Sequence, residues 1–274
     1  MNKIKEFLKI IGVLIGISLV TFASGFVINL LGINPNNPNI NLYIILISQV
    51  IYGLCAYMII KRKNKLADGP YIKNKGFISD SWKMVFIGMG TAGFGNILIS
   101  LLMQALGEND LVNQSIDIVT TAFSATSIAS IIIQTILIVV IAPIVEELLF
   151  RGYVFTETKK IFSFGVAILL NGLLFGLYHM NLLQGINTFF LAMVLSTVYY
   201  YRRNITDSIL VHASNNFIAI LSSFIPEYAS IIGVILIISI FIGAYLLYKI
   251  IKNGKVFYKE NSFKQKDNLT NDKL

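Results

Sequence analysis

The sequence predicts an all-α, polytopic membrane protein with about eight transmembrane helices and a buried polar site. Hydrophobic residues make up 55% of the 274 positions, and only 13% are charged, against roughly 25% in ordinary globular chains. The mean hydropathy is +0.73. Because a soluble domain of this length cannot bury so much apolar surface, the composition excludes disordered proteins, disulfide-rich secreted scaffolds and most cytosolic enzymes.

The apolar segments predict the number of helices. A helix needs about 20 apolar residues to span a bilayer. Eight segments of about this length cover residues 7–31, 41–60, 83–105, 127–150, 163–179, 186–201, 207–225 and 229–251. We therefore divide the chain into three parts. Residues 1–126 hold three helices and a basic loop, residues 127–225 form a central core, and residues 226–274 hold the last helix and a polar tail that we expect to be disordered.

The Lys and Arg residues predict the direction of the helices. All 22 lie at or near one side of the predicted membrane, and the connections on the other side contain none. Because cytoplasmic loops carry the excess of Lys and Arg in membrane proteins, we expect a multi-pass protein of the cell membrane with both termini in the cytoplasm. The net charge of +8 is then a topology signal, and nucleic acid is not an expected partner.

Few ionisable residues lie inside the predicted spans, and such residues suggest function because they are costly in lipid. Three of them are close together within residues 141–152. Glu147 and Arg151 are four residues apart on one helix face, so we expect them to pair. Glu146 lies about 100° further around the helix and is left for chemistry. Pro143 is expected to kink the helix just before it. The alternative is a purely structural ion pair.

The two histidines of the chain also lie in predicted spans. His179 follows Phe175 by four residues and Asn216 follows His212 by four, so each pair shares a helix face. At about 1.5 Å per residue, Glu146 and these polar groups lie about 13 to 22 Å from the inner helix ends. Similar depth on three helices predicts one shared polar cavity. The alternatives are a histidine at the membrane interface and a hydrogen bond between helices.

Side chains of these types suit hydrolysis of a carbonyl compound, most naturally a peptide bond. A carboxylate beside a neutral imidazole can hold and deprotonate water, and a second histidine with an amide can stabilise an oxyanion. No Ser or Cys is obviously paired with either histidine. Zinc bound by Glu146, His179 and His212 is possible by ligand type, but the HExxH spacing is absent. We therefore predict no metal and no other cofactor.

Three motifs occur in order along the chain: EExxxR at 146–151, FxxxH at 175–179 and HxxxN at 212–216. Together they resemble the CPBP family, also called ABI or type II CAAX prenyl protease-like, of intramembrane glutamic endopeptidases. The resemblance covers about residues 127–225. It implies that Glu146 and His179 hold the attacking water. His212 and Asn216 would form the oxyanion site. The supporting residues would be Glu147, Arg151 and Phe175.

The resemblance implies an intramembrane endopeptidase that cleaves a membrane-embedded or lipid-associated peptide or protein. It leaves the substrate open, because the family includes eukaryotic enzymes that trim prenylated proteins and bacterial members linked to bacteriocin immunity or pheromone maturation. Short loops favour the bacterial kind. Two alternatives remain: a non-catalytic immunity or scaffold protein of the same fold, and a coupled transporter. Inverted repeats would favour the transporter, and the sequence shows none.

Overall fold

The computed structural model describes residues 2–30, 38–63, 77–107, 109–122 and 127–271. Within these ranges every regular element is a helix, which confirms the all-α class for the described part of the chain. The α-helices are α1 (Lys3–Leu30), α2 (Pro38–Lys63), α3 (Phe77–Leu106), α4 (Asp110–Ala122), α5 (Ile128–Ile136), α6 (Ala142–Glu147), α7 (Thr156–Ile161), α8 (Phe164–Tyr178), α9 (Leu182–Arg202), α10 (Ile205–Phe224) and α11 (Ala229–Asn271). The others are the π-helices η1 (Leu137–Ile141) and η2 (Leu148–Phe155) and the 3₁₀ helix η3 (Pro226–Tyr228).

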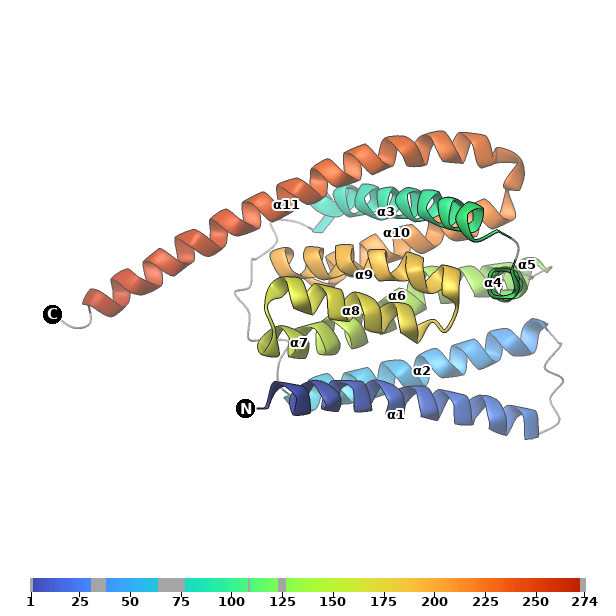
Figure 1. Ribbon diagram of the computed structural model, residues 1–274, viewed down its shortest axis with the longest axis horizontal. Helices are drawn as coiled ribbons and strands as arrows, with labels where there is room; N and C mark the ends of the chain where they lie inside the picture. Colours follow the sequence, from blue (N-terminus) through green and yellow to red (C-terminus); the bar gives the residue numbers. More distant parts are fainter. Residues whose placement is uncertain (1, 31–37, 64–76, 108, 123–126, 272–274) are drawn as a thin grey trace.

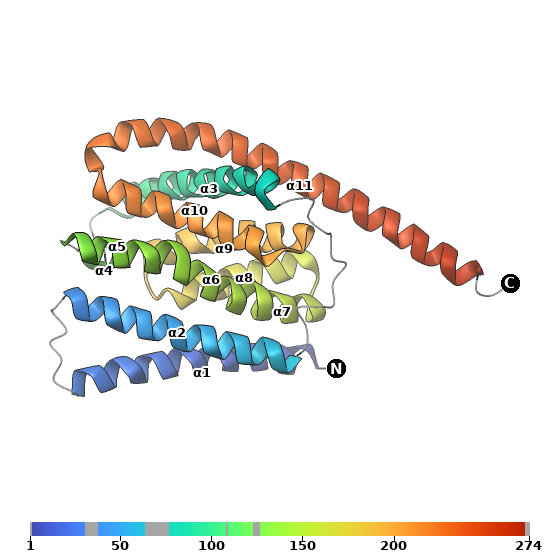
Figure 2. The ribbon, with the colours of Figure 1, turned by 180° about the vertical axis from the view of Figure 1, so that it is seen from behind.

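The long helices lie side by side in an elongated bundle (Figure 1). The α1–α2 hairpin forms one side and α3 with α11 forms the other, as both views show (Figures 1 and 2). Between them lie α8, α9, α10 and the continuous helix that runs from α5 through η1, α6 and η2 to α7. The segments that carry the predicted site residues are therefore enclosed between two outer layers of helices.

Four helical stretches of the described residues are long and apolar enough to cross a membrane. They are Asp80–Leu106, Ile128–Ile161, Leu182–Arg202 and Pro226–Lys255. Each of the eight predicted apolar segments overlaps a helix, but α8 has only 15 residues and α10 contains many polar residues. These findings agree with a membrane protein. The count of eight membrane crossings is not confirmed and stays a prediction.

Two segments are helical where the sequence predicts none. The connection 106–126 contains α4, which begins after Asn109, whose side chain accepts a hydrogen bond from the amide of Val112 (3.0 Å). Val112 is buried while Leu111 is exposed, so α4 is a short amphipathic helix and lacks the apolar length of a span. The predicted disorder of the tail is wrong up to Asn271, where α11 ends. That segment contains no proline and is rich in lysine, which has a favourable helix propensity.

The helix from Ile128 to Ile161 contains the predicted distortion at Pro143. Proline has no N–H to donate and clashes with the preceding turn. The structure accommodates it by the π-helix η1 just before the proline, in which the amide of Ala142 bonds the carbonyl of Leu137. A second π-helix, η2, follows Glu147 and contains Arg151. Single π segments inside α-helices frequently mark functional sites.

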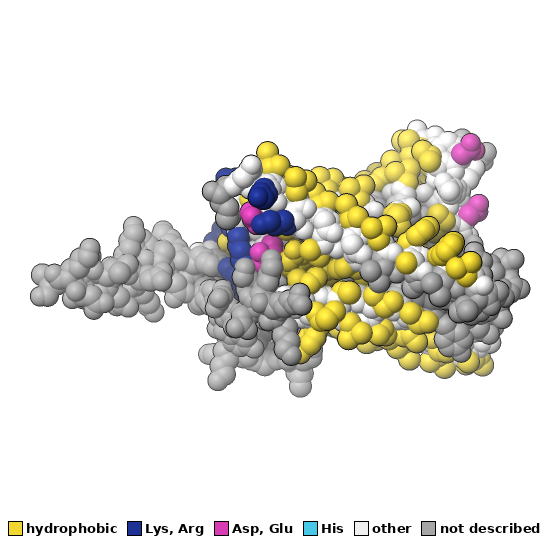
Figure 3. Space-filling view, turned by 90° about the horizontal axis from the view of Figure 1, so that it is seen from below, with side chains coloured by type: hydrophobic (Ala, Val, Ile, Leu, Met, Phe, Trp, Pro, Cys, Tyr) yellow, Lys and Arg dark blue, Asp and Glu magenta, His cyan; other side chains and the backbone are white. Residues whose placement is uncertain are grey.

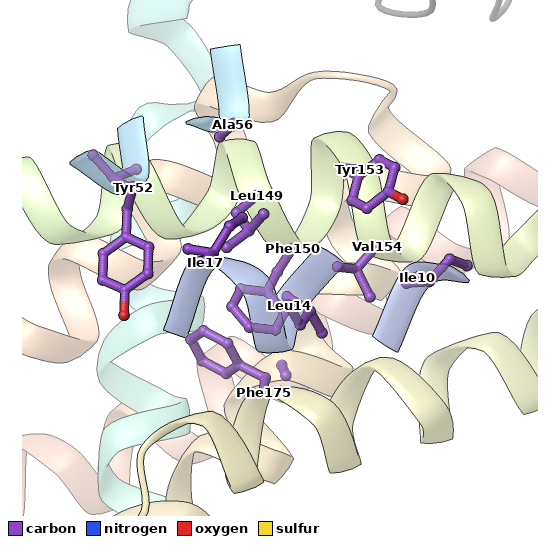
Figure 4. Close-up of a cluster of buried hydrophobic side chains, with 12 residues drawn as sticks. Ile10, Leu14, Ile17, Tyr52, Ala56, Leu149, Phe150, Tyr153, Val154 and Phe175 are labelled. Carbon is purple, nitrogen blue, oxygen red and sulfur yellow. The ribbon is translucent and has the colours of Figure 1, made fainter. Parts of the chain in front are cut away.

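A hydrophobic cluster fixes this distorted helix against α1, α2 and α8 (Figure 4). Phe150 of η2 and Phe175 of α8 are both fully buried, and their ring centroids lie 4.6 Å apart in an edge-to-face arrangement. Leu14 of α1 and Tyr52 of α2 belong to the same cluster. Because Phe150 directly precedes Arg151 on η2, this packing fixes the segment that carries the predicted site residues within the bundle.

Candidate active site

The second glutamate of the EExxxR motif is the centre of a buried hydrogen-bond network. One oxygen of Glu147, Oε1, accepts hydrogen bonds from Arg151 Nη1 (2.7 Å) and from His212 Nδ1 (2.9 Å). Arg151 also donates from Nη2 to the carbonyl of Ala192 in α9 (3.3 Å). Glu147 and Arg151 are completely buried. The predicted Glu147–Arg151 contact is therefore present, and it reaches a histidine that the sequence alone did not link to it.

The first glutamate has different surroundings. Glu146 Oε2 faces Nε2 of His212 at 3.7 Å, which is longer than a direct hydrogen bond. The carboxylate of Glu146 has no hydrogen bond with another described residue, and 11% of its side chain is accessible, against 0% for Glu147. Since His212 Nδ1 is turned to Glu147, its other nitrogen is directed to Glu146. The two adjacent carboxylates thus occupy separate sides of one imidazole.

Phe175 joins the motifs of α6, η2, α8 and α10. The guanidinium of Arg151 lies 4.8 Å from the centre of its ring, an arrangement typical of cation–π contact. The rings of His179 and His212 lie 4.8 and 5.8 Å from it, both nearly perpendicular. The structure therefore places three predicted residues, Arg151, His179 and His212, against the buried ring of Phe175, and Glu147 joins them through Arg151.

His179 is the C-cap residue that follows α8, and its ring is held by that helix. Nδ1 lies 2.8 Å from the carbonyl oxygen of Phe175. A carbonyl only accepts hydrogen bonds, so Nδ1 carries the proton and Nε2 of a neutral ring is an acceptor. His179 interacts electrostatically with Glu146 and His212, but no direct hydrogen bond joins it to Glu146 among the described residues. A molecule held by both groups would have to bridge them.

Asn216 lies one turn beyond His212 on α10. Its amide nitrogen Nδ2 donates to the carbonyl of Ile138 in η1 (2.9 Å). The predicted oxyanion donor is thus in contact with the distorted helix that carries Glu146. An amide nitrogen has two N–H groups, so this bond uses one of them.

Two polar groups that the motifs do not include support the site. Asn171 donates to the carbonyl of Phe150 (3.2 Å) and accepts from the hydroxyl of Ser196 (2.9 Å), and both side chains are completely buried. Together they tie η2 to α8 and α9. Asn171 shares the helix face of Phe175 and His179, which the sequence shows, whereas Ser196 stands in an apolar run with no spacing signal.

Two tyrosines complete the surroundings of Glu146. Tyr178 packs edge-to-face on Phe150 and on Tyr52 of α2. Tyr178 also interacts electrostatically with Glu146. Tyr52 lies far outside the three motifs in the sequence, so no motif spacing could have identified it.

The described residues contain no group of three or more His, Cys, Asp and Glu side chains arranged to hold a metal ion. Glu147 Oε1 is already engaged by Arg151 and His212. The carboxylate that orients His212 is the kind of second partner that a ligating histidine also has. The independence of the chemistry from metal therefore stays a prediction to be tested in solution.

Comparison with known proteins identifies the family of this chain. The family model described as "Type II CAAX prenyl endopeptidase Rce1-like" matches residues 128–218. The chain is also 31% identical over 157 residues to the UPF0177 protein YxdF of Lactococcus lactis subsp. lactis, and the alignment covers 53% of this chain and 80% of that protein. The chain belongs to the Rce1-like type II CAAX prenyl endopeptidase family. No solved structure matches.

The Rce1-like match defines which part of the fold the family shares. It begins with α5 and ends within α10, so it includes all seven predicted site residues. The family confirms the resemblance inferred from the motifs and fits a membrane protein of CAAX protease-like type. Helices α1 to α3 and α11 lie outside the match, and they surround the shared core on both sides (Figures 1 and 2).

Proposed function

We propose that this Rce1-like protein is an intramembrane endopeptidase that hydrolyses a peptide bond with water activated by a glutamate. The single observation that carries the proposal is the unequal environment of two adjacent carboxylates. Glu147 is bound by Arg151 and His212. Within the described residues, Glu146 has no such hydrogen bond. Its side chain is slightly accessible and faces Nε2 of His212, the ring nitrogen that does not contact Glu147. A carboxylate in that position can act as a general base.

In the proposed first step, a water molecule lies between Glu146 and the acceptor nitrogen Nε2 of His179. Glu146 removes one proton from the water while its oxygen attacks the carbonyl carbon of the peptide bond. The carbonyl electrons move to its oxygen and form a tetrahedral oxyanion. The C–N bond then breaks, and the leaving nitrogen takes the proton from Glu146, so atoms and charges balance. The products are a carboxylic acid and an amine.

His212 and Asn216 are the proposed donors to the oxyanion. Glu147 fixes the His212 ring through Nδ1, which directs Nε2 to the side on which Glu146 lies. As an imidazolium, His212 donates from Nε2, and Asn216 donates from the N–H that Ile138 does not use. Donors that are already positioned cost no reorganisation when charge develops. Arg151 and Phe175 hold Glu147 and the rings in place.

The substrate proposed for this site is a membrane-embedded or lipid-associated peptide or protein, because the site residues lie in apolar helices enclosed by other helices. The core of the enzyme is residues 127–225. We propose a multi-pass protein of the cell membrane with both termini in the cytoplasm. No nucleic acid and no cofactor take part.

Comparison of membrane proteomes from cells that carry the parent or Glu146→Ala tests this function. We expect at least one peptide or protein to accumulate in an unprocessed form only with Glu146→Ala. Glu157→Ala is the matched control, because Glu157 lies on the same continuous helix and pairs with Lys160 at its end. Identical proteomes for parent and Glu146→Ala, at equal amounts of folded protein, would support a non-catalytic immunity or scaffold role instead.

A further inference from the structure

The carbonyl of Ile138 has lost its helical partners. In an α-helix it would accept from the amide of Ala142, but that amide bonds Leu137 instead. In the wider π-helix it would accept from position 143, which is Pro143 and has no N–H. Both in-chain donors are therefore lost at the same carbonyl, and the reason lies in the sequence.

Asn216 supplies the missing donor from a different helix. Its Nδ2 lies 2.9 Å from the oxygen of Ile138. Such a carbonyl is costly inside a membrane, where water is not available as an alternative partner. The bond therefore stabilises the break in the helix and ties α10 to η1 at that point.

This contact joins the two helices that carry Glu146 and His212. Glu146 follows Pro143 by three residues, and His212 precedes Asn216 by one helical turn. Two links hold α10 against the distorted helix: Asn216 to Ile138 before the proline and His212 to Glu147 after it. With both ends fixed, the position of Glu146 relative to His212 Nε2 is determined.

We infer that Asn216 is a positioning residue that compensates for the carbonyl freed by Pro143 and thereby sets the placement of Glu146 opposite His212. This role rests on the proposed function only as far as Glu146 is the catalytic base. It is separate from the oxyanion role of the same amide, which requires the second N–H. The two roles predict different behaviour when Pro143 is replaced.

A double-mutant cycle with Pro143→Ala and Asn216→Ala separates them. Alanine in place of Pro143 restores an N–H, so Ile138 regains a helical donor and the Asn216 bond becomes dispensable. We expect Asn216→Ala to lower the thermal midpoint of the purified full-length protein in detergent, and to lower it by at most about half as much in the Pro143→Ala background. Equal decreases in the two backgrounds would overturn the inference.

The matched control is Asn215→Ala, one position away on α10. Asn215 is buried, but its Nδ2 has no hydrogen-bond partner, so its effect should add to that of Pro143→Ala without coupling. Coupling of Asn215 to Pro143 as strong as that of Asn216 would show a general loosening of α10, and it would also overturn the inference.

Activity gives the second reading, measured per folded molecule as conversion of the peptide that accumulates in Glu146→Ala cells. We expect the loss caused by Asn216→Ala to be about tenfold smaller in the Pro143→Ala background. Coupled stabilities with equal activity losses would overturn the positioning of Glu146. If no peptide is processed by the parent protein, the proposed function fails, while the thermal cycle still decides whether Asn216 compensates for Pro143.

Discussion

At the scale of single residues, the candidate site shows how two identical side chains next to each other acquire different surroundings. Glu147 is completely buried and its Oε1 receives two hydrogen bonds, one from a guanidinium and one from an imidazole. Glu146 is the next residue towards the N-terminus and therefore points about 100° around the helix from Glu147. It faces Nε2 of His212, whereas Glu147 contacts Nδ1 of the same ring. The helix geometry therefore gives the two carboxylates unequal surroundings, which is the basis for proposing Glu147 as the structural residue and Glu146 as the base.

Substitution of each glutamate by glutamine should separate these roles. Glu146→Gln is expected to abolish processing while the protein stays folded, because an amide does not accept the proton of the water. Glu147→Gln should destabilise the protein by about 3–5 kcal/mol, because it leaves Arg151 buried without its charge partner. Thermal unfolding and processing measured for both variants check this. Equal stability and equal residual activity of the two would contradict the assignment.

The oxyanion donors should matter less than the base. Removal of one such donor typically lowers kcat by about 10²–10³, so His212→Ala and Asn216→Ala are expected in that range, and Glu146→Ala well below both. Turnover per folded protein is the quantity to compare. Loss of activity in Asn216→Ala as complete as in Glu146→Ala would argue against this order.

The reaction is also expected to proceed without metal, because the sequence lacks the HExxH spacing of a zinc site. The test is purified protein treated with EDTA and phenanthroline, with its metal content determined by mass spectrometry. Full activity of the metal-free protein is the expected result. Activity that disappears on chelation and returns with one equivalent of zinc would require Glu146, His179 and His212 to be reinterpreted as ligands.

At the scale of helices, the sequence predicts the position of the distortion in the helix, but it does not predict the type of distortion. Pro143 indicates a distortion before Glu146, and η1 lies there. That the distortion is a π-helix, and that Asn216 compensates for it from α10, depends on packing between segments that are distant along the chain. The i, i+4 spacings predicted the Glu147–Arg151 contact because it is local. The contact from Glu147 to His212 spans 65 positions, and no spacing rule reaches that far.

The approach of α8 to α9 is a testable element of this packing. A Cβ added to Gly176 would lie 2.6 Å from the backbone oxygen of Gly185, whereas a Cβ added to Gly165 in the same helix would meet nothing within 4 Å. Gly176→Ala should therefore cost about 1–3 kcal/mol and displace His179, the C-cap residue of α8. Gly165→Ala should leave stability unchanged or raise it by up to about 1 kcal/mol. Thermal midpoints of the two variants make the comparison, and equal midpoints would contradict it.

At the scale of the whole molecule, charge is distributed along the bundle axis. On the face shown in Figure 3, hydrophobic side chains cover the middle, Lys and Arg gather at the end from which α11 extends, and Asp and Glu also occur at the opposite end. The first residues of α1 and the last residues of α11 lie on the side of that basic end (Figure 1). There Arg202 links α9 to α10 and α3 through Asp207 (2.5 Å) and Asp80 (3.0 Å). This polarity is the three-dimensional form of the pattern of Lys and Arg in the sequence.

The orientation that follows from this polarity can be tested by labelling a cysteine in the basic loop. Position 75, a lysine outside the described residues, is predicted to be cytoplasmic because positively charged loops remain on that side. In a Cys55→Ser background, Lys75→Cys should resist a membrane-impermeant thiol reagent in intact cells and react once the cells are opened. Ser127→Cys is the control for the other side, because Ser127 begins the continuous helix at its non-basic end, and it should react in intact cells. Labelling of Lys75→Cys from outside intact cells would reverse the proposed topology and place both termini outside the cytoplasm.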